Sequence, residues 1–385
     1  MQFRPEAIAA KESTLIQIAM AAEAVHDPYR LYYGESDMPT PDFIGRAMTE
    51  AVARGHTQYT ATAGTTALRE AIVEKFHTLQ GVEYSPDEVT TTVGAGMAIF
   101  LAIRACVGAG DNVIIVSPAF SVFASTVTVF GGEVREVPLV RDGRRFRLDL
   151  DCLRDAIDSR TRMLVVNSPS NPTGWVITRE EQEALWTLAL KHDVLILSDE
   201  VYDRLVFTGD VAPSFARIAT DREHLLVINS FSKTYNMTGW RLGYAMGSEK
   251  LIKLMTKVEE FIISSPPAMI QQAGITALRD GEPFIRDLRA KYAERRRVVM
   301  DRLSRVPGLS LPEAEGAFYA FPQIDGMTDS MAFVKELLRA TRVALAPGIA
   351  FGRFGEGYVR ISYASSESVL MPAIDLFAEF MSARK

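Results

Sequence analysis

The chain has 385 residues, two to three times the length of a typical domain of about 150 residues, so two packed units or one large one are expected. Hydrophobic residues make up 48% and charged residues 23% of the sequence, which excludes an intrinsically disordered chain. Lysine and arginine number 42 against 48 aspartates and glutamates, for a net charge of −6, and no basic stripe of the kind that binds nucleic acid is present.

Short apolar runs alternate with helix-like stretches through the first two thirds of the chain. Strands are expected at 89–93, 112–116, 163–166, 194–197 and 225–228, with helices that include 97–107 and 180–192. Strands that are apolar on both faces and alternate with helices are typical of a mostly parallel sheet covered by helices. We therefore predict an α/β fold.

The C-terminal third has a different pattern. A long amphipathic helix is expected from Pro283 to about Val306, followed by a strand at 317–321, a helix at 330–341 and a strand at 358–362. This order indicates a smaller α+β domain. The predicted division is an N-terminal arm and part of the small domain at 1–45, a large ligand-binding domain at 46–280, and a small C-terminal α+β domain at 281–385.

Side chains with complementary chemical groups follow four of the predicted strands. Phe120, Asn171, Asp199 and Lys233 come shortly after them and carry an aromatic ring, an amide, a carboxylate and an amine. Ligands of open α/β sheets bind beyond the carboxyl ends of the strands, so we expect these side chains at one rim of the sheet.

Lys233 follows an apolar strand and lies among Ser230, Ser232 and Thr234. Burial there lowers the pKa of a lysine and makes it a nucleophile that forms Schiff bases, whereas a solvated lysine at a helix start has no such role. Ser230–Lys233 also matches the S-x-x-K of serine acyl enzymes. The S-D-N and K-T-G segments that accompany S-x-x-K in those enzymes do not occur in the sequence.

Asp199, Asn171 and Phe120 each have two interpretations. A carboxylate at position 199 can hold a pyridinium nitrogen protonated, or it can cap the next helix. Asn171 precedes a proline in a tight turn, where it is either a rigidly held hydrogen-bond donor or only part of the turn. Phe120 can stack on a cofactor ring or belong to the core.

The segment after the first predicted strand, 89–93, offers an anion site. Gly94, Ala95 and Gly96 open the predicted helix at 97–107, and small residues at a helix start expose backbone N–H groups to a phosphate. Arg241 can add a charged fork to the same phosphate, or it can be an ordinary surface residue. The segment does not match G-x-G-x-x-G, so it is not a dinucleotide motif.

Together these residues supply a phosphate cup, a ring stacker, a carboxylate for a ring nitrogen and a Schiff-base lysine, which are the groups that pyridoxal 5′-phosphate needs. The five histidines form no i,i+4 pair, so no metal site is predicted. Cys106 and Cys152 lie in no motif and fit a reduced interior. No apolar run of about 18 residues and no apolar signal segment is present, and a cytoplasmic protein is expected.

With these residues assembled, the chain resembles the class I/II aminotransferases of the fold-type I pyridoxal-phosphate enzymes. The resemblance runs in order from Gly34 to Ala364. It is carried by Tyr59 with Gly64 and Leu68-Arg69, Asn171–Gly174, Ser198–Tyr202, Ser230–Lys233, Thr238–Gly243, Gly316–Tyr319 and Tyr358–Ser362.

The resemblance implies roles around the cofactor ring. Lys233 would form the Schiff base and carry the proton to and from the substrate Cα. Asp199 would pair with the ring nitrogen, Asn171 and Tyr202 would hydrogen-bond the ring oxygen, and Phe120 would stack on the ring.

It also implies roles for phosphate and substrate. Arg360 would bind the α-carboxylate of the substrate, helped by the Gly34 backbone and by Asn171. Tyr59 would reach the phosphate of a neighbouring subunit, which makes a homodimer part of the site. The remaining phosphate ligands would be the amides of Ala95 and Gly96 with Ser230, Ser232 and Arg241.

Two differences between this chain and the family pattern bear on the choice of substrate. Aspartate enzymes of the animal and enteric type carry a second arginine where this chain has Glu260, and no arginine lies between Arg241 and Arg279. The predicted phosphate-binding segment has the sequence Ala95-Gly96-Met97, where relatives often carry a lysine or glutamine. Dicarboxylate specificity of the animal and enteric type is therefore not expected, although aspartate itself stays open.

The function that the resemblance implies is transfer of an amino group from an L-amino acid to a 2-oxo acid by a ping-pong cycle in a cytoplasmic homodimer. One alternative keeps the cofactor and changes the reaction to that of a C–S β-lyase or another Cα-carbanion enzyme. The other is a non-catalytic ligand-binding protein with the same fold.

Overall fold

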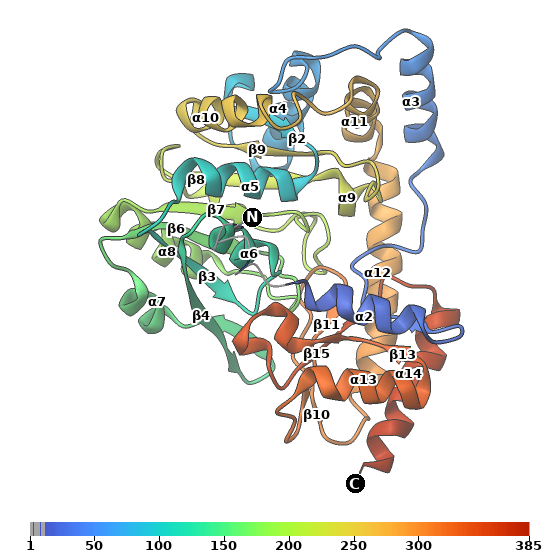
Figure 1. The fold of residues 1–385 in the computed structure, drawn as a ribbon. Coiled ribbons are helices and arrows are strands. Elements are labelled where there is room, and N and C mark those ends of the chain that lie inside the picture. Colours follow the sequence, from blue (N-terminus) through green and yellow to red (C-terminus); the bar gives the residue numbers. More distant parts are fainter. Residues whose placement is uncertain (1–2, 4–7, 9–11, 385) are drawn as a thin grey trace.

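The computed structural model describes residues 3, 8 and 12–384. Its largest element is an eight-stranded sheet with the order β2-β9-β8-β7-β6-β3-β4-β5, flanked by helices (Figure 1). The strands are β2 (Val89–Thr92), β3 (Asn112–Ser117), β4 (Glu133–Asp142), β5 (Arg145–Leu148), β6 (Thr161–Asn167), β7 (Leu195–Asp199), β8 (Leu225–Ser230) and β9 (Gly243–Met246).

The five central strands β8, β7, β6, β3 and β4 are parallel, whereas β5, β9 and β2 join antiparallel at the two sides. The predicted α/β class is confirmed. The hairpin of β4 and β5 was not predicted, because β4 buries only alternate residues near its end and has no apolar run.

Two hydrophobic clusters cover the two faces of the sheet. Val113 and Ile115 of β3 belong to one cluster, and Ile114 and Val116 belong to the other, which explains why the four central positions of the strand are all apolar. One face is covered by α5 (Ala95–Cys106), α6 (Val122–Val129) and α10 (Glu249–Glu260), and the other by elements that include α4 (Thr66–Gln80), α7 (Leu150–Ala156) and α8 (Arg179–His192).

The long helix α12 (Glu282–Leu303) leads into the C-terminal elements (Figure 1). A three-stranded antiparallel sheet has the order β11-β15-β14, and β10 pairs with β12. The bounds are α11 (Ala268–Asp280), β10 (Leu309–Ser310), β11 (Tyr319–Ala320), β12 (Gln323–Ile324), α13 (Ser330–Thr341), β13 (Val343–Ala344), β14 (Ala346–Pro347), β15 (Val359–Ser362) and α14 (Glu367–Ala383).

The predicted C-terminal elements are present, with two differences. The long helix ends at Leu303 rather than near Val306. The strand predicted at 317–321 is reduced to Tyr319–Ala320, because Ala317 has a φ of +57°, which an extended strand does not allow.

The N-terminal segment lies against the C-terminal elements. β1 (Tyr29–Arg30) pairs in parallel with β13, and α2 (Thr14–Glu23) is in contact with β14 and α13, whereas α3 (Asp42–Ala53) packs on α11. This arrangement supports the assignment of residues before 46 partly to the small domain. The domain boundaries at 45/46 and 280/281 stay predictions.

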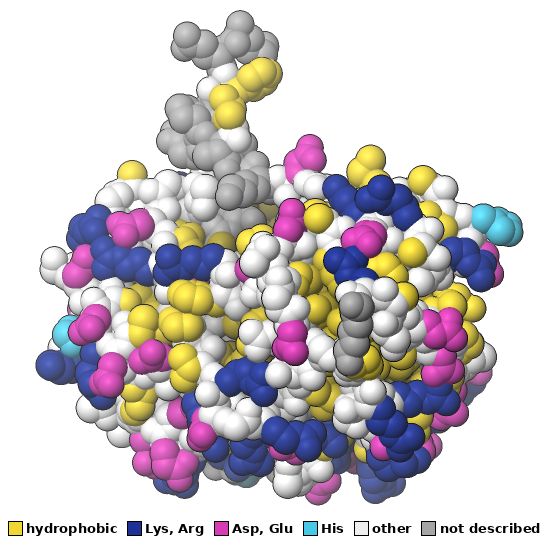
Figure 2. All heavy atoms as spheres, turned by 90° about the horizontal axis from the view of Figure 1, so that it is seen from below, with side chains coloured by type: hydrophobic (Ala, Val, Ile, Leu, Met, Phe, Trp, Pro, Cys, Tyr) yellow, Lys and Arg dark blue, Asp and Glu magenta, His cyan; other side chains and the backbone are white. Residues whose placement is uncertain are grey.

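Charged side chains of both signs are interspersed on the face shown in Figure 2. Within residues 12–384 and the two isolated described positions, no helix is long and apolar enough to cross a membrane.

Candidate functional site

A cavity of about 470 Å³ opens where the carboxyl ends of the parallel strands meet the C-terminal elements. It brings together every residue that the sequence predicted for the site except Tyr59. The predicted residues that line it are Gly34, Ala95, Gly96, Phe120, Asn171, Asp199, Tyr202, Ser230, Ser232, Lys233, Arg241 and Arg360.

Tyr59 is the exception. Its side chain is 92% exposed, and it does not line the cavity. Its predicted role involves the cavity of another subunit, which a single chain does not test.

Lys233 lies on the short helix α9 (Phe231–Thr234) directly after β8. Its Nζ donates to the backbone oxygen of Gly34 at 2.5 Å. Burial, together with the positive charges of Arg360 and Arg241 and against the opposing effect of Glu35, lowers the pKa of Lys233 to about 8. A lysine with this pKa is partly neutral near pH 7 and is therefore a competent nucleophile and proton carrier.

Asp199 ends β7 and faces the same cavity. Burial raises the pKa of Asp199 to about 7, although the Val201 N–H, at 3.2 Å from its Oδ1, and the Lys233 charge both favour the ionised form. The segment after it forms turns rather than a helix, so Asp199 is not a helix cap. A buried carboxyl with one hydrogen bond is suited to pair with a cation that enters the cavity.

Asn167 supports Asp199 and Asn171 and received no role from the sequence. Its Nδ2 donates to the backbone oxygen of Asp199 at 3.1 Å, and its Oδ1 accepts from the Asn171 backbone N–H at 2.8 Å. Asn167 ends β6 in the same way that Asp199 ends β7, and this position was the only available signal.

Arg360 on β15 is 2% exposed and has a guanidinium carbon 4.4 Å from the ring centre of Tyr319. Its Nη1 donates to Asn171 Oδ1 at 2.7 Å, and its Nη2 donates to the Tyr32 backbone oxygen. Nε is buried without a partner among the described residues. Burial lowers the pKa of Arg360, so a carboxylate entering the cavity would meet a poorly solvated cation.

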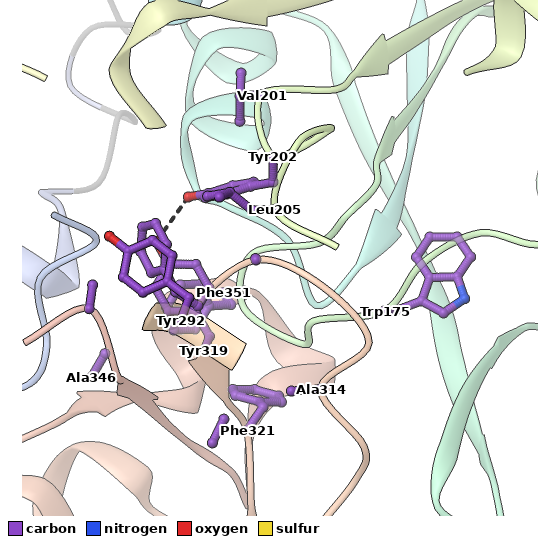
Figure 3. Close-up of a cluster of buried hydrophobic side chains, with 14 of the residues drawn as sticks. Trp175, Val201, Tyr202, Leu205, Tyr292, Ala314, Tyr319, Phe321, Ala346 and Phe351 are labelled. Atoms are coloured by element: carbon purple, nitrogen blue, oxygen red, sulfur yellow. Dashed lines mark hydrogen bonds between the residues drawn. The ribbon is translucent and has the colours of Figure 1, made fainter. Parts of the chain in front are cut away.

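Two tyrosines form the floor beside Arg360. Tyr202 and Tyr319 share a hydrogen bond between their hydroxyls at 2.9 Å (Figure 3). Gly34 lies so close to Tyr319 that a Cβ at position 34 would overlap its hydroxyl. This glycine therefore allows the backbone to approach the cavity and present its carbonyl to Lys233.

The first turn of α5 and the β8–α9 segment bring together groups that can bind an anion. Gly94, with φ +78°, precedes the helix, and a Cβ there would collide with the guanidinium of Arg241. The Ser230 and Ser232 hydroxyls are 2.9 Å apart and line the same cavity as Ala95 and Gly96. Helix N-terminal amides, hydroxyls and an arginine are the ligands that bind phosphate.

The structure adds an apolar wall that the sequence analysis missed. Leu15, Ile16 and Ala19 of α2 line the cavity with Tyr33 and Ile99. The hydrophobic spacing of 15, 16 and 19 was a signal for a helix but not for its location. Only the tertiary fold brings α2 to the mouth of the cavity.

Comparisons with known proteins agree with this geometry. The model of the family "Aminotransferase class I and II" matches residues 30–375. An aspartate aminotransferase of Pyrococcus horikoshii is 37% identical over 97% of this chain and 96% of its own length. An aromatic-amino-acid aminotransferase of Thermococcus litoralis is 36% identical over 94% of each chain.

Solved structures show the same similarity. A mutant aspartate aminotransferase of Thermus thermophilus superposes with a TM-score of 0.92 at 36% identity, covering 98% of this chain and 99% of its own.

Proposed function

Because the chain belongs to the class I and II aminotransferases, it is a transaminase that uses pyridoxal phosphate, and we propose that it performs both half-reactions in the cavity around Lys233. The amino group of an L-amino acid is passed to a 2-oxo acid. The observation that carries this proposal is that Lys233, Asp199, Arg360 and the anion site all line one cavity. The names of the relatives favour transamination over the β-lyase and ligand-binding alternatives.

The residues present fit the cofactor. The Ala95 and Gly96 amides, the two serine hydroxyls and Arg241 would hold its phosphate, and the buried Asp199 would pair with its ring nitrogen. Phe120, exposed at the end of β3, would stack on the ring, and Asn171 with Tyr202 would bind the ring oxygen. When bound, the cofactor supplies an electron-withdrawing ring that stabilises negative charge at the substrate Cα.

Lys233 and Arg360 would act on different groups of the substrate. Arg360 would hold the α-carboxylate, helped by Asn171 and the Gly34 backbone, which fixes the Cα–H bond relative to the ring plane. Lys233 Nζ would then accept and return the Cα proton. The pKa of Lys233, about 8, suits this task, because a group that titrates near the working pH both takes and gives up a proton readily.

We further propose a homodimer in which Tyr59 reaches the phosphate of the partner subunit. Two observations support it. Tyr59 is almost fully exposed and lies outside its own cavity. Phe261, Ile262 and Ile263, which follow α10, are also exposed, with Phe261 at 82%, and such an apolar surface is typical of an interface.

A cytoplasmic location is part of the same proposal. Cys106 and Cys152 are both free, as in proteins of a reducing compartment.

The test is an absorption spectrum recorded before and after one L-amino acid is added without any oxo acid. We expect the visible band of the bound cofactor to be lost as one equivalent of the matching 2-oxo acid per site appears. Lys233→Ala should fold and retain cofactor but lose steady turnover, whereas Lys253→Ala, at an exposed position, should leave turnover unchanged. Release of pyruvate and ammonia without amino transfer would instead indicate a β-lyase. A protein that never binds the cofactor would be neither a transaminase nor a β-lyase.

A further inference from the structure

We propose that the amino donor for which this transaminase is specific has an apolar side chain, aromatic or large aliphatic, which packs against α2 and Tyr33. The inference rests on the proposed function and adds the substrate class to it. The overall likeness to relatives does not decide this point, because an aspartate enzyme and an aromatic-amino-acid enzyme are 37% and 36% identical to the chain.

The first observation is the charge of the cavity wall. Among the described residues that line the cavity, the cations are Lys233, Arg241 and Arg360. Each has a task in the proposed function, at the Cα proton, the phosphate and the α-carboxylate respectively. A second carboxylate on the substrate would therefore meet no further cation among the described cavity-lining residues of its own subunit, and burial of an unpaired carboxylate is strongly unfavourable.

A negative charge near the entrance acts in the same direction. Glu35 follows Gly34 in the chain, and its carboxylate accepts a hydrogen bond from Thr238, which lines the cavity. Glu35 is also close enough to Lys233 to oppose the lowering of its pKa. An acidic substrate side chain would be repelled at this side of the cavity.

The second observation is that the apolar side of α2 is shared between the core and the cavity. Ile18 and Ala22 are fully buried, and α2 is in contact with β14 and α13 (Figure 1). Leu15, Ile16 and Ala19 instead line the cavity, and Ile16 is 59% exposed. A large apolar side chain exposed in an active-site cavity gains from being covered by an apolar ligand.

The third observation is the rest of the cavity wall. Ile99, one turn beyond the proposed phosphate ligands of α5, and Tyr33 also line the cavity, and both are apolar or aromatic. Tyr33 packs on Tyr32 with ring centres 4.3 Å apart, which gives the wall an aromatic surface.

The first experiment measures kcat/KM for phenylalanine, leucine, methionine, aspartate and glutamate with one common 2-oxo acid. We expect the best apolar donor to exceed both acidic donors at least tenfold. Aspartate or glutamate as the best donor would overturn the inference while leaving transamination itself intact. If no donor in the panel reacts, the proposed function fails, and the side-chain class is decided by binding alone.

That binding experiment uses 3-phenylpropionate and succinate with the holoenzyme. Both carry a carboxylate for Arg360 but no amino group, so they report on the side-chain wall without turnover. We expect 3-phenylpropionate to have the lower Kd, by at least tenfold, in calorimetry. Equal or tighter binding of succinate contradicts the inference.

A charge placed on the wall tests its location. Ile16→Arg adds a cation at an exposed position that lines the cavity, whereas Gln17→Arg adds the same charge one residue along the helix at an exposed position outside it. Only Ile16→Arg should shift the ratio of kcat/KM for aspartate over phenylalanine, upward by at least tenfold. If both variants leave the ratio unchanged, or shift it equally, α2 does not contact the substrate side chain.

Discussion

Arg360 Nη1 donates to Asn171 Oδ1 at 2.7 Å, across 189 positions of sequence. The bond joins β15 of the C-terminal sheet to the turn that follows β6 of the large sheet. The Nε of the same guanidinium is buried and has no partner among the described residues. The residue proposed to bind the substrate is therefore also a tie between the two halves of the cavity wall.

Arg360→Lys keeps the positive charge and removes the planar fork. We expect kcat/KM to fall at least tenfold for every amino donor, mainly through KM, because the α-carboxylate is common to all donors. Arg297→Lys, at an exposed position of α12, is the matched control and should leave kcat/KM unchanged. A loss confined to some donors would show that Arg360 selects the side chain instead.

The site residues at the ends of the strands could be predicted from the sequence, whereas the residues that hydrogen-bond to them could not. Lys233, Asp199 and Asn171 follow apolar runs, and the rule that ligands bind at the carboxyl ends of parallel strands places them together. Asn167 and Tyr319 act through hydrogen bonds to residues 32 and 117 positions away. A single sequence contains no signal for such pairs.

Asp199→Asn should affect stability and cofactor binding in opposite directions. The pKa of Asp199 is about 7 in the folded chain, above its ordinary value of 3.8, so the folded state binds more protons than the unfolded state between these pH values. The stability of cofactor-free protein therefore falls as pH rises from about 4 to 7. At pH 8 the variant should be more stable than wild type by roughly 1–4 kcal/mol, and at pH 4 the difference should vanish.

The same substitution removes the anion for the ring nitrogen, so cofactor affinity should fall at least tenfold. Urea unfolding of cofactor-free protein at both pH values and a cofactor titration provide the measurements. Asp151→Asn, at an exposed position, is the control for both. If Asp199→Asn is as stable as wild type at pH 8 and binds the cofactor with wild-type affinity, the charge of Asp199 affects neither stability nor cofactor binding.

Gly94→Ala tests the anion site through a steric contact. The new Cβ would collide with the Arg241 guanidinium, at a backbone φ of +78°. Gly81 at the end of α4 has a φ of +71° and no atom within 4 Å of an added Cβ. Gly81→Ala should lose about 1 kcal/mol of stability from its left-handed backbone. Gly94→Ala should lose roughly 1–3 kcal/mol, because φ +78° with ψ 163° is a backbone conformation that essentially only glycine adopts. Only Gly94→Ala should lose cofactor affinity, at least tenfold.

Equilibrium dialysis with pyridoxal phosphate measures that affinity, and thermal unfolding measures the loss of stability in each variant. Equal cofactor affinity in the two variants would show that Arg241 does not bind the phosphate.

The apolar wall shows where sequence analysis reaches its limit. Leu15, Ile18, Ala19 and Ala22 have the i, i+3, i+4, i+7 spacing of one apolar helix face, and Ile16 lies at its edge. Which part of this face meets the core and which part meets the ligand depends on how α2 packs against β14 and α13. That packing is a property of the whole fold, because its members lie more than 300 residues apart in the chain.

Tyr59 gives a prediction about two subunits. If it serves the partner's site, a dimer of one Tyr59→Ala subunit and one Lys233→Ala subunit has both lesions in one site and none in the other. Mixing the two inactive proteins under conditions of subunit exchange should then restore about a quarter of wild-type activity, because half of the dimers are mixed and half of their sites are intact. The assay is run at a cofactor concentration that leaves the Tyr59→Ala protein mostly unloaded. If Tyr59 instead serves its own subunit, every site carries one lesion and mixing restores nothing, and a monomer in sedimentation analysis would exclude the dimer altogether.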